Sequence, residues 1–177
     1  SQIKILAPDE IANINAQTTA DMLESTGSVM VQKSQAGGGS PIIRGFEANR
    51  ILLVVDGVRM NNAIYRSGHL QNAITVDNNV LQSTDIYFGP GSVIYGSDAL
   101  GGVIHFHTKT PRFKGAQDFT GASVKSIARY SSINQERTGH IDLELGGKKW
   151  AYLASLTRSS FGDLRMGLNR VHGFDDF

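Results

Sequence analysis

Hydrophobic positions in the first 110 residues come in short runs that turn-forming residues separate. The runs are rich in β-branched residues and have strand length: 2–6, 29–33, 42–46, 51–55, 85–88 and 103–108. Thr18 and Asp21 have the spacing of a capping box, and Gly27 suits a helix C-cap, so a helix of about two turns is predicted between them. Shorter helical turns are predicted at 8–10 and 78–82. The pattern indicates an α+β fold, a small mixed sheet with short helices.

Turns and loops are expected between these strands. Asp56-Gly57 lies between Val55 and Val58 and is the strongest short-range hairpin signal, because both turn residues accept a positive φ. A glycine-rich loop is predicted at Gly37–Ser40, and the polar stretch 61–72 is typical of a loop. Loops on a rigid scaffold often bind ligands, so His69 in this stretch is a candidate ligand contact. A solvated loop histidine is the simpler interpretation.

Residues 113–177 follow a different pattern, with stretches of about ten residues that alternate apolar and polar positions. One face of each stretch is apolar: Ala122, Val124, Ala128 and Tyr130; Ile141, Leu143 and Leu145; Trp150, Tyr152, Ala154 and Leu156. Period-two alternation fits a soluble antiparallel sheet packed on a core. It fits equally the lipid-facing and lumen-facing sides of transmembrane β-strands. Three strands cannot close a barrel, since barrels begin at about eight strands, so the second interpretation implies a fragment.

Composition narrows the function classes. Lys+Arg 17 against Asp+Glu 16 gives a net charge of +1, which argues against a nucleic-acid binder. The absence of cysteine excludes disulfides, thiolate metal sites and cysteine nucleophiles. The longest apolar run, 51–55, is far shorter than a membrane helix, and the chain opens on Ser1 without a signal peptide, so a processed or excised product is expected.

The sequence contains partial matches to nucleotide-binding and metal-binding motifs, but each match lacks a residue that the chemistry requires. The glycines of 89–96 lack the third glycine of a dinucleotide fingerprint and the lysine of a phosphate loop, so a structural turn is expected there. His105 and His107 share one strand face and could share a metal, but no third ligand is close in sequence, and a polar sheet face explains them better. We therefore predict no enzyme activity, no metal site and no resident cofactor.

Three segments in order resemble the plug domain of TonB-dependent outer-membrane receptors: Pro41–Phe46, Arg50–Arg59 and Asp85–Ile104. The resemblance implies a plug domain over residues 1–112 and the N-terminal fragment of a transmembrane β-barrel over residues 113–177. The chain departs from the family at Asp85 and Phe88, where the family usually has Glu and Arg. The TonB-contacting box expected upstream of the plug is not evident before Ile3.

The resemblance implies a receptor in the outer membrane of a Gram-negative bacterium. Its plug would gate the barrel and help to bind and import a scarce nutrient such as haem, an iron-siderophore or cobalamin. Expected partners are TonB, the rest of the receptor's own barrel and the nutrient. The apical loops at 46–49 and 61–71 supply the candidate ligand-binding residues, which are Asn49, Asn61, Asn62, Tyr65, Arg66, His69 and Gln71. The stretch 101–109 is similar to haem and haemoglobin receptors of the family. A soluble β-rich binding module is the alternative.

Overall fold

The computed structural model describes residues 2–34, 38–46, 50–60, 76–89, 95–96, 99–113 and 122–163. The chain divides into two compact units, Ser1–Thr110 and Pro111–Phe177, and each unit is treated by itself below. Within the described residues, no helix has both the length and the apolar character needed to cross a membrane.

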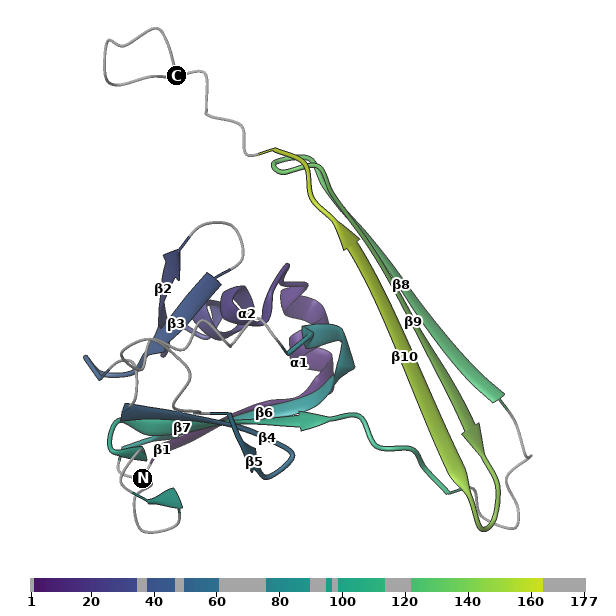
Figure 1. Cartoon of the computed structure of the whole chain (residues 1–177), viewed down its shortest axis with the longest axis horizontal. Helices are drawn as coiled ribbons and strands as arrows, with labels where there is room; N and C mark the ends of the chain where they lie inside the picture. Colours follow the sequence, from purple (N-terminus) through teal and green to yellow (C-terminus); the bar gives the residue numbers. More distant parts are fainter. Residues whose placement is uncertain are drawn as a thin grey trace, which may run out of the picture. The chain divides into compact units, whose positions relative to one another are not determined.

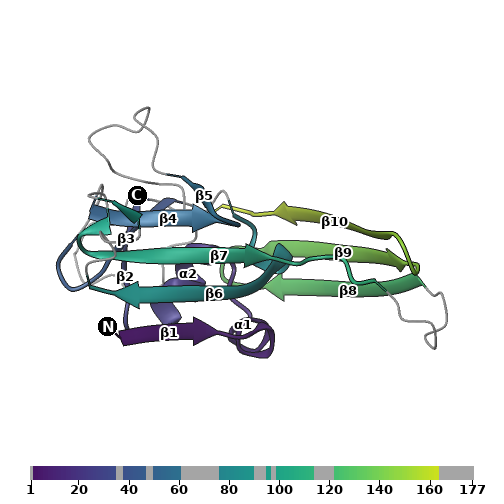
Figure 2. The ribbon, with the colours of Figure 1, turned by 90° about the horizontal axis from the view of Figure 1, so that it is seen from below.

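A five-stranded mixed sheet is the centre of the first unit (Figures 1 and 2). Its strands lie in the order β1-β6-β7-β4-β5, and β7 and β4 are parallel while the other neighbours are antiparallel. The bounds are β1 Gln2–Leu6, β4 Ile51–Val55, β5 Val58–Arg59, β6 Leu81–Phe88 and β7 Gly102–Thr108. The predicted α+β architecture is confirmed.

Two short helices lie on one face of this sheet (Figure 1). Helix α1 spans Pro8–Ile14, and helix α2 spans Thr19–Ser25. The Thr18 hydroxyl accepts the Asp21 N–H at 3.1 Å, as the capping-box spacing predicts. The main core on this face is fully buried, and it includes Leu6, Met22, Leu23, Ile51, Ile86, Ile104 and Phe106.

A separate hairpin, β2 Met30–Ser34 with β3 Gly38–Ile42, corrects two predictions. Gly38 and Gly39 lie in a strand rather than a loop. A Cβ atom on Gly39 would lie 2.5 Å from Val31 Cγ1, so only glycine fits at this close approach. The predicted strand 42–46 is also wrong. Arg44 and Gly45 take φ of 50° and 82°, which turns the chain, and Ile43 pairs with Phe46 across that turn.

The 3₁₀ helix Asn78–Val80 is shorter than the predicted helix 78–82, because β6 already begins at Leu81. Asn78 Nδ2 donates to Ala16 O at 2.7 Å, and the Thr19 hydroxyl donates to Val76 O. The segment that enters β6 is therefore fixed to both sides of the α1–α2 junction.

The second unit is a three-stranded antiparallel sheet in the order β10-β9-β8. Its strands are β8 Ala122–Ser131, β9 Glu136–Gly146 and β10 Ala151–Ser160. The register is regular over each pair: Val124 and Ala154 both lie opposite Leu143, and Ser126 and Leu156 both lie opposite Ile141. The three alternating stretches of the sequence are confirmed as strands, and their apolar positions share one face.

Candidate functional site

The seven ligand-binding residues predicted from the sequence lie outside the described residues: Asn49, Asn61, Asn62, Tyr65, Arg66, His69 and Gln71. The described residues beside them are firmly held. The Met60 N–H donates to Leu53 O at 2.8 Å, where β5 ends at the edge of the sheet. On the other side, Val76 and Asn78 are tied to the α1–α2 junction. The described residues on either side of 61–75, the range that contains the candidate loop 61–71, are thus fixed parts of the plug sheet and its helices.

One end of the five-stranded sheet gathers the residues that border the predicted loops. The strand registers place Ile51, Phe88 and Gly102 in one row at this end. Gly101 N–H donates to Arg50 O at 2.8 Å, and a Cβ on Gly101 would lie 2.4 Å from Phe46 Cβ. Because Gly101 has no side chain, the chain before β7 can lie directly against Phe46 and Arg50, which lie at the ends of the candidate loop 46–49. The sequence around Gly101 does not reveal this contact.

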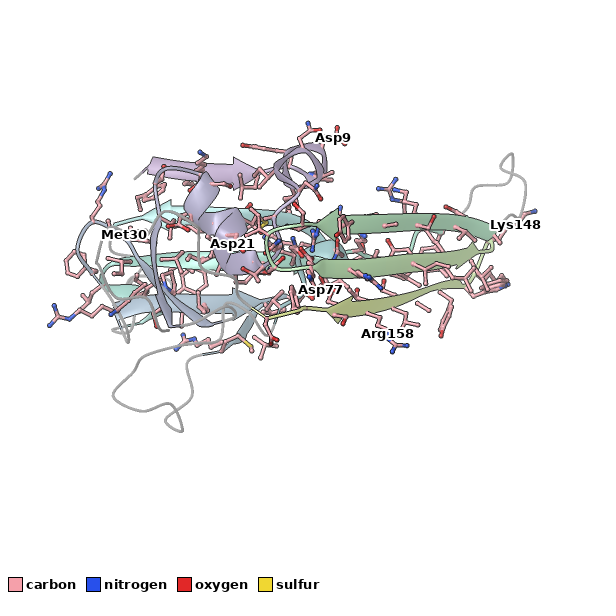
Figure 3. The ribbon with its side chains drawn as sticks, turned by 90° about the horizontal axis from the view of Figure 1, so that it is seen from above. Asp9, Asp21, Met30, Asp77, Lys148 and Arg158 are labelled. Atoms are coloured by element: carbon pink, nitrogen blue, oxygen red, sulfur yellow. The ribbon has the colours of Figure 1, made fainter. Side chains whose placement is uncertain are left out.

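Next to this end, Arg44 and Ser28 are shared by two shallow grooves of about 530 and 320 Å³. The Arg44 guanidinium lies 5.6 Å from the centre of the Phe88 ring, a cation–π distance. Lys4, which lines the smaller groove, donates from Nζ to Thr26 O at 2.8 Å. Met30 on β2 lines the larger groove and is well exposed (labelled in Figure 3). Phe88, which stands where the resemblance leads one to expect an arginine, thus packs under an arginine from the turn that follows β3.

The face of the sheet opposite the main core has a polar cluster that the sequence only partly indicated. His105 and His107 project from β7 with ring centres 4.0 Å apart, as their spacing predicts. Asp85 on β6 lies opposite His105, and its Oδ2 is 3.1 Å from His107 Nε2 and accepts the Tyr87 hydroxyl at 3.3 Å. Sequence reasoning missed Asp85 because the cross-strand register, not sequence distance, places it there.

The two histidines do not complete a metal site. His105 Nε2 accepts the Gly57 N–H at 3.2 Å, so that nitrogen is already engaged. Within the part of the chain that the structure describes, no three histidine, cysteine or acidic side chains are arranged to hold a metal ion. The cluster is a hydrogen-bonded polar face.

Burial is the largest cause that lowers the pKa of His105, and the neighbouring His107 lowers it further, while Asp85 and Asp56 act in the opposite direction. Burial raises the pKa of Asp56, but hydrogen bonds from the Thr108 hydroxyl and N–H, together with His107 and His105, outweigh it and leave that pKa below its ordinary value. The pKa of Tyr87 is raised by burial and then by Asp85. At neutral pH, neutral His105 and ionised Asp56 are therefore the favoured forms in the folded protein.

The sheet of the second unit exposes its apolar face. Val124, Ile141, Leu143, Tyr152 and Leu156 are all exposed, Leu156 by 70%. A soluble sheet packs its apolar side on a core, whereas a membrane-spanning strand turns that side to lipid. Lys148 and Lys149 lie in the turn between β9 and β10, at one end of the apolar face (Figure 3). The apolar band ends at a charged turn, as expected where a strand leaves the hydrocarbon layer.

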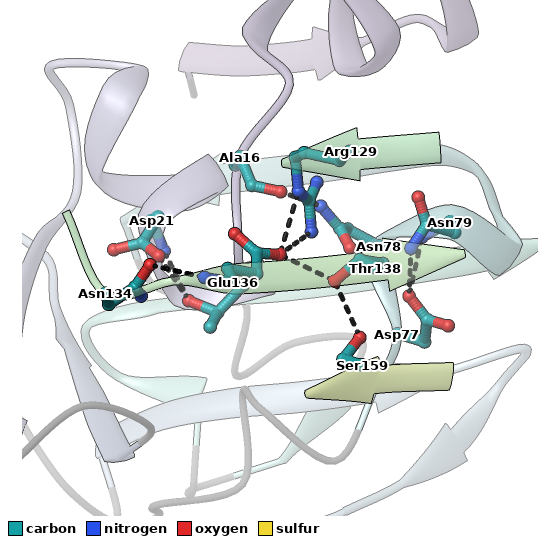
Figure 4. Close-up of polar contacts among 11 residues, drawn as sticks. Ala16, Asp21, Asp77, Asn78, Asn79, Arg129, Asn134, Glu136, Thr138 and Ser159 are labelled. Atoms are coloured by element: carbon teal, nitrogen blue, oxygen red, sulfur yellow. Dashed lines mark hydrogen bonds and ion pairs between the residues drawn. The ribbon is translucent and has the colours of Figure 1, made fainter. Parts of the chain in front are cut away.

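The opposite face of the same sheet is a hydrogen-bonded polar network (Figure 4). Arg129 Nη2 lies 2.8 Å from Glu136 Oε1, which also accepts the Thr138 hydroxyl at 2.7 Å. Farther along β9, His140 lies between Thr157 Oγ1 at 2.7 Å and Asp142 Oδ1 at 2.9 Å. Most of the charged side chains lie on one face and most of the exposed aliphatic ones on the other, with Arg137 and Arg158 at one end of the apolar face. This arrangement favours the wall of a barrel over half of a sandwich.

A small mixed sheet with two short helices, followed by antiparallel strands that expose an apolar face, is the arrangement expected of a plug domain and the barrel strands after it. Residues 1–103 match the TonB-dependent Receptor Plug Domain family. The chain belongs to this family.

Relatives and solved structures agree with this assignment. The chain is 36% identical over 134 residues to the vitamin B12 transporter BtuB of Vibrio vulnificus (strain CMCP6), covering 75% of this chain and 20% of the relative. It is 37% identical over 94 residues to the hemin receptor of Yersinia pestis, covering 52% and 13%. The structure of the FrpB iron transporter from Neisseria meningitidis (F3-3 variant) shares the fold with a TM-score of 0.76 at 18% identity, over 98% of this chain and 25% of that one. The chain spans about a fifth or less of the length of these curated relatives.

Proposed function

We propose that this chain is the plug and the opening wall strands of a receptor that imports a scarce nutrient across the outer membrane, driven by TonB. The plug, residues 1–112, gates the barrel and contributes to nutrient binding, and residues 113–177 begin the barrel wall. The family match supports the first assignment. A wide barrel needs such a plug, because about 22 strands enclose a lumen that is otherwise open.

The observation that carries the proposal is the exposed apolar face of β8, β9 and β10. Leu143 on this face lies between Val124 and Ala154, whereas Leu153 lies on the polar face opposite Glu144. The same residue type therefore occurs on both faces of one sheet, which provides a matched pair of variants.

In the full-length receptor, Leu143→Arg is expected to reduce folded protein in the outer membrane strongly, since an arginine on the lipid face costs about 2–4 kcal/mol near the bilayer midplane. Leu153→Arg is expected to have a small effect, because its guanidinium faces the lumen and Glu144. The measurement is the heat-modifiable band of the folded barrel in isolated outer membranes. Equal losses from the two variants, or none from Leu143→Arg, would contradict the assignment of the faces.

The cargo belongs to the same proposal. Relatives include a vitamin B12 transporter and a hemin receptor, which favour cobalamin and haem as the nutrient. Iron-siderophores, which the family resemblance implies, are the third candidate class. The proposed contacts are the seven loop residues Asn49, Asn61, Asn62, Tyr65, Arg66, His69 and Gln71. For haem, a neutral His69 would offer an imidazole nitrogen to the iron, and Arg66 would pair with a propionate. In this arrangement haem is the cargo and not a resident cofactor.

Haem titration of the full-length receptor, followed by Soret absorbance, tests the haem form of the proposal. His69→Ala is expected to weaken binding and to change the ligation spectrum, whereas His107→Gln, in the sheet cluster, is expected to leave both unchanged. An unaltered spectrum in His69→Ala would remove His69 as an axial ligand. Binding of cobalamin or a ferric siderophore by a receptor that gives no Soret change with haem would assign the cargo to the other classes.

A further inference from the structure

Both residues of the β4–β5 turn are hydrogen-bonded to β7. Asp56 N–H donates to Phe106 O at 3.0 Å, and the Asp56 carboxylate accepts the Thr108 N–H at 2.9 Å and the Thr108 hydroxyl at 2.6 Å. The Gly57 N–H donates to His105 Nε2 at 3.2 Å. The turn is therefore held by one anchor that needs an ionised carboxylate and by another that needs a neutral imidazole.

The imidazole anchor has a strict protonation requirement. A ring nitrogen accepts a hydrogen bond only when it bears no proton, and both nitrogens of a protonated histidine are donors. Protonated His105 would thus present an N–H to the N–H of Gly57. We propose that the Gly57–His105 hydrogen bond makes the β4–β5 turn an acid-sensitive joint of the plug, which loosens at its glycine while its aspartate stays attached to β7.

The surroundings of His105 set the pH range. Among the described residues, the charged or titratable side chains on this sheet face and in the turn are Asp56, Arg59, Asp85, Tyr87, Tyr95, His107 and Lys109. Burial and His107 lower the pKa of His105 below its ordinary 6.5, against Asp85 and Asp56. The Gly57 anchor is hence complete at neutral pH and is lost as the pH falls from 6.5 through the lower pKa of folded His105.

The carboxylate anchor persists in this range. The pKa of Asp56 lies below its ordinary 3.8, so Asp56 stays ionised and keeps Thr108 until the pH falls below that value. At a pH between the pKa of folded His105 and that of Asp56, the Gly57–His105 hydrogen bond is lost while the Asp56–Thr108 hydrogen bonds remain. This separation distinguishes a local joint from general acid unfolding of the sheet, which would release both.

The test is amide hydrogen exchange of Gly57 and Thr108, read by NMR in the whole chain at a series of pH values from 7.5 to about 4, which stays above the pKa of Asp56, and expressed as protection factors. The protection factor of Gly57 is expected to fall about fivefold to tenfold across this series, the ratio that corresponds to one hydrogen bond. The protection factor of Thr108 is expected to change less than about twofold on the same scale. Constant protection of Gly57, or a parallel loss at Thr108, would overturn the proposal.

Two variants make the assignment specific. His105→Gln keeps a side-chain acceptor that does not titrate, so Gly57 protection is expected to become independent of pH over this range. His107→Gln removes the neighbouring imidazole, so the midpoint of the Gly57 transition is expected to rise, because His107 lowers the pKa of His105. A pH-dependent loss of Gly57 protection that persists in His105→Gln, or a midpoint that does not rise in His107→Gln, would refute the proposal.

Discussion

Thr84 is a buried hydroxyl in the sheet core, and its replacement by valine is expected to stabilise the plug. Thr84 lies on β6 between Leu6 of β1 and Phe106 of β7, and it is completely buried. Its Oγ1 has no hydrogen-bond partner within the described part of the chain. Because a buried hydroxyl that is unpaired has lost its water without a replacement, Thr84→Val removes a cost while nearly keeping the side-chain shape.

The expected gain is about 1–2 kcal/mol in the free energy of unfolding, since an unsatisfied buried polar group costs about 1–3 kcal/mol. Thr108 provides the matched control on the neighbouring strand. Its hydroxyl donates to Asp56 Oδ2 at 2.6 Å, so Thr108→Val is expected to destabilise the plug by about 1 kcal/mol. The same chemical change thus has opposite signs at two positions of one sheet.

Urea unfolding of the whole chain measures both effects, with hydrogen exchange of β6 and β7 peptides as the signal, because this signal reports the unit Ser1–Thr110 alone. At a slope of about 1–3 kcal/mol per molar urea, Thr84→Val should raise the midpoint by about 1 M. A lower midpoint for Thr84→Val would show that its hydroxyl makes a hydrogen bond in the native state and would refute the reasoning.

Three further outcomes are expected from the same unfolding assay. Gly101→Ala should destabilise the plug by about 1–3 kcal/mol, because the new Cβ would lie 2.4 Å from Phe46 Cβ; a neutral effect would contradict this close approach. Thr18→Ala should cost about 1 kcal/mol through loss of the α2 N-cap, and an unchanged midpoint would show that the cap contributes nothing. Asp56→Asn should destabilise the plug at neutral pH, and the difference from the parent should vanish as the pH falls through the lowered pKa of Asp56; a difference that persists at low pH would contradict the ionised anchor.

Local signals in the sequence were sufficient where one segment decides its own conformation. The hairpin at Asp56-Gly57 forms with φ of 47° and 84° at its two turn residues, and Thr18 caps α2 as predicted. Strand β1 has the predicted bounds. In each case the determining interactions lie within a few residues, so spacing and residue type contain the information.

The predicted secondary structure was wrong where a segment far away in the sequence determines the local conformation. Gly38 and Gly39 resembled a loop, yet both lie in β3, and Val31 on the paired strand uses the space that the missing side chain of Gly39 leaves. Ile42–Phe46 resembled one strand, but Arg44 lies in a turn with positive φ and stacks on Phe88 from β6. The sequence contains no local sign of either partner.

The sequence by itself determined the family, the division of patterns near residue 111 and the two faces of the later strands, because residue order and period-two alternation are properties of the chain alone. Only the tertiary structure decided which face is exposed, which carboxylate meets the histidines and which donors hold the β4–β5 turn. Nothing in the sequence indicates that His105 accepts a hydrogen bond from Gly57. It does so because the parallel register of β4 and β7 places the Gly57 amide beside its ring, and a register is fixed by packing between strands that are far apart along the chain.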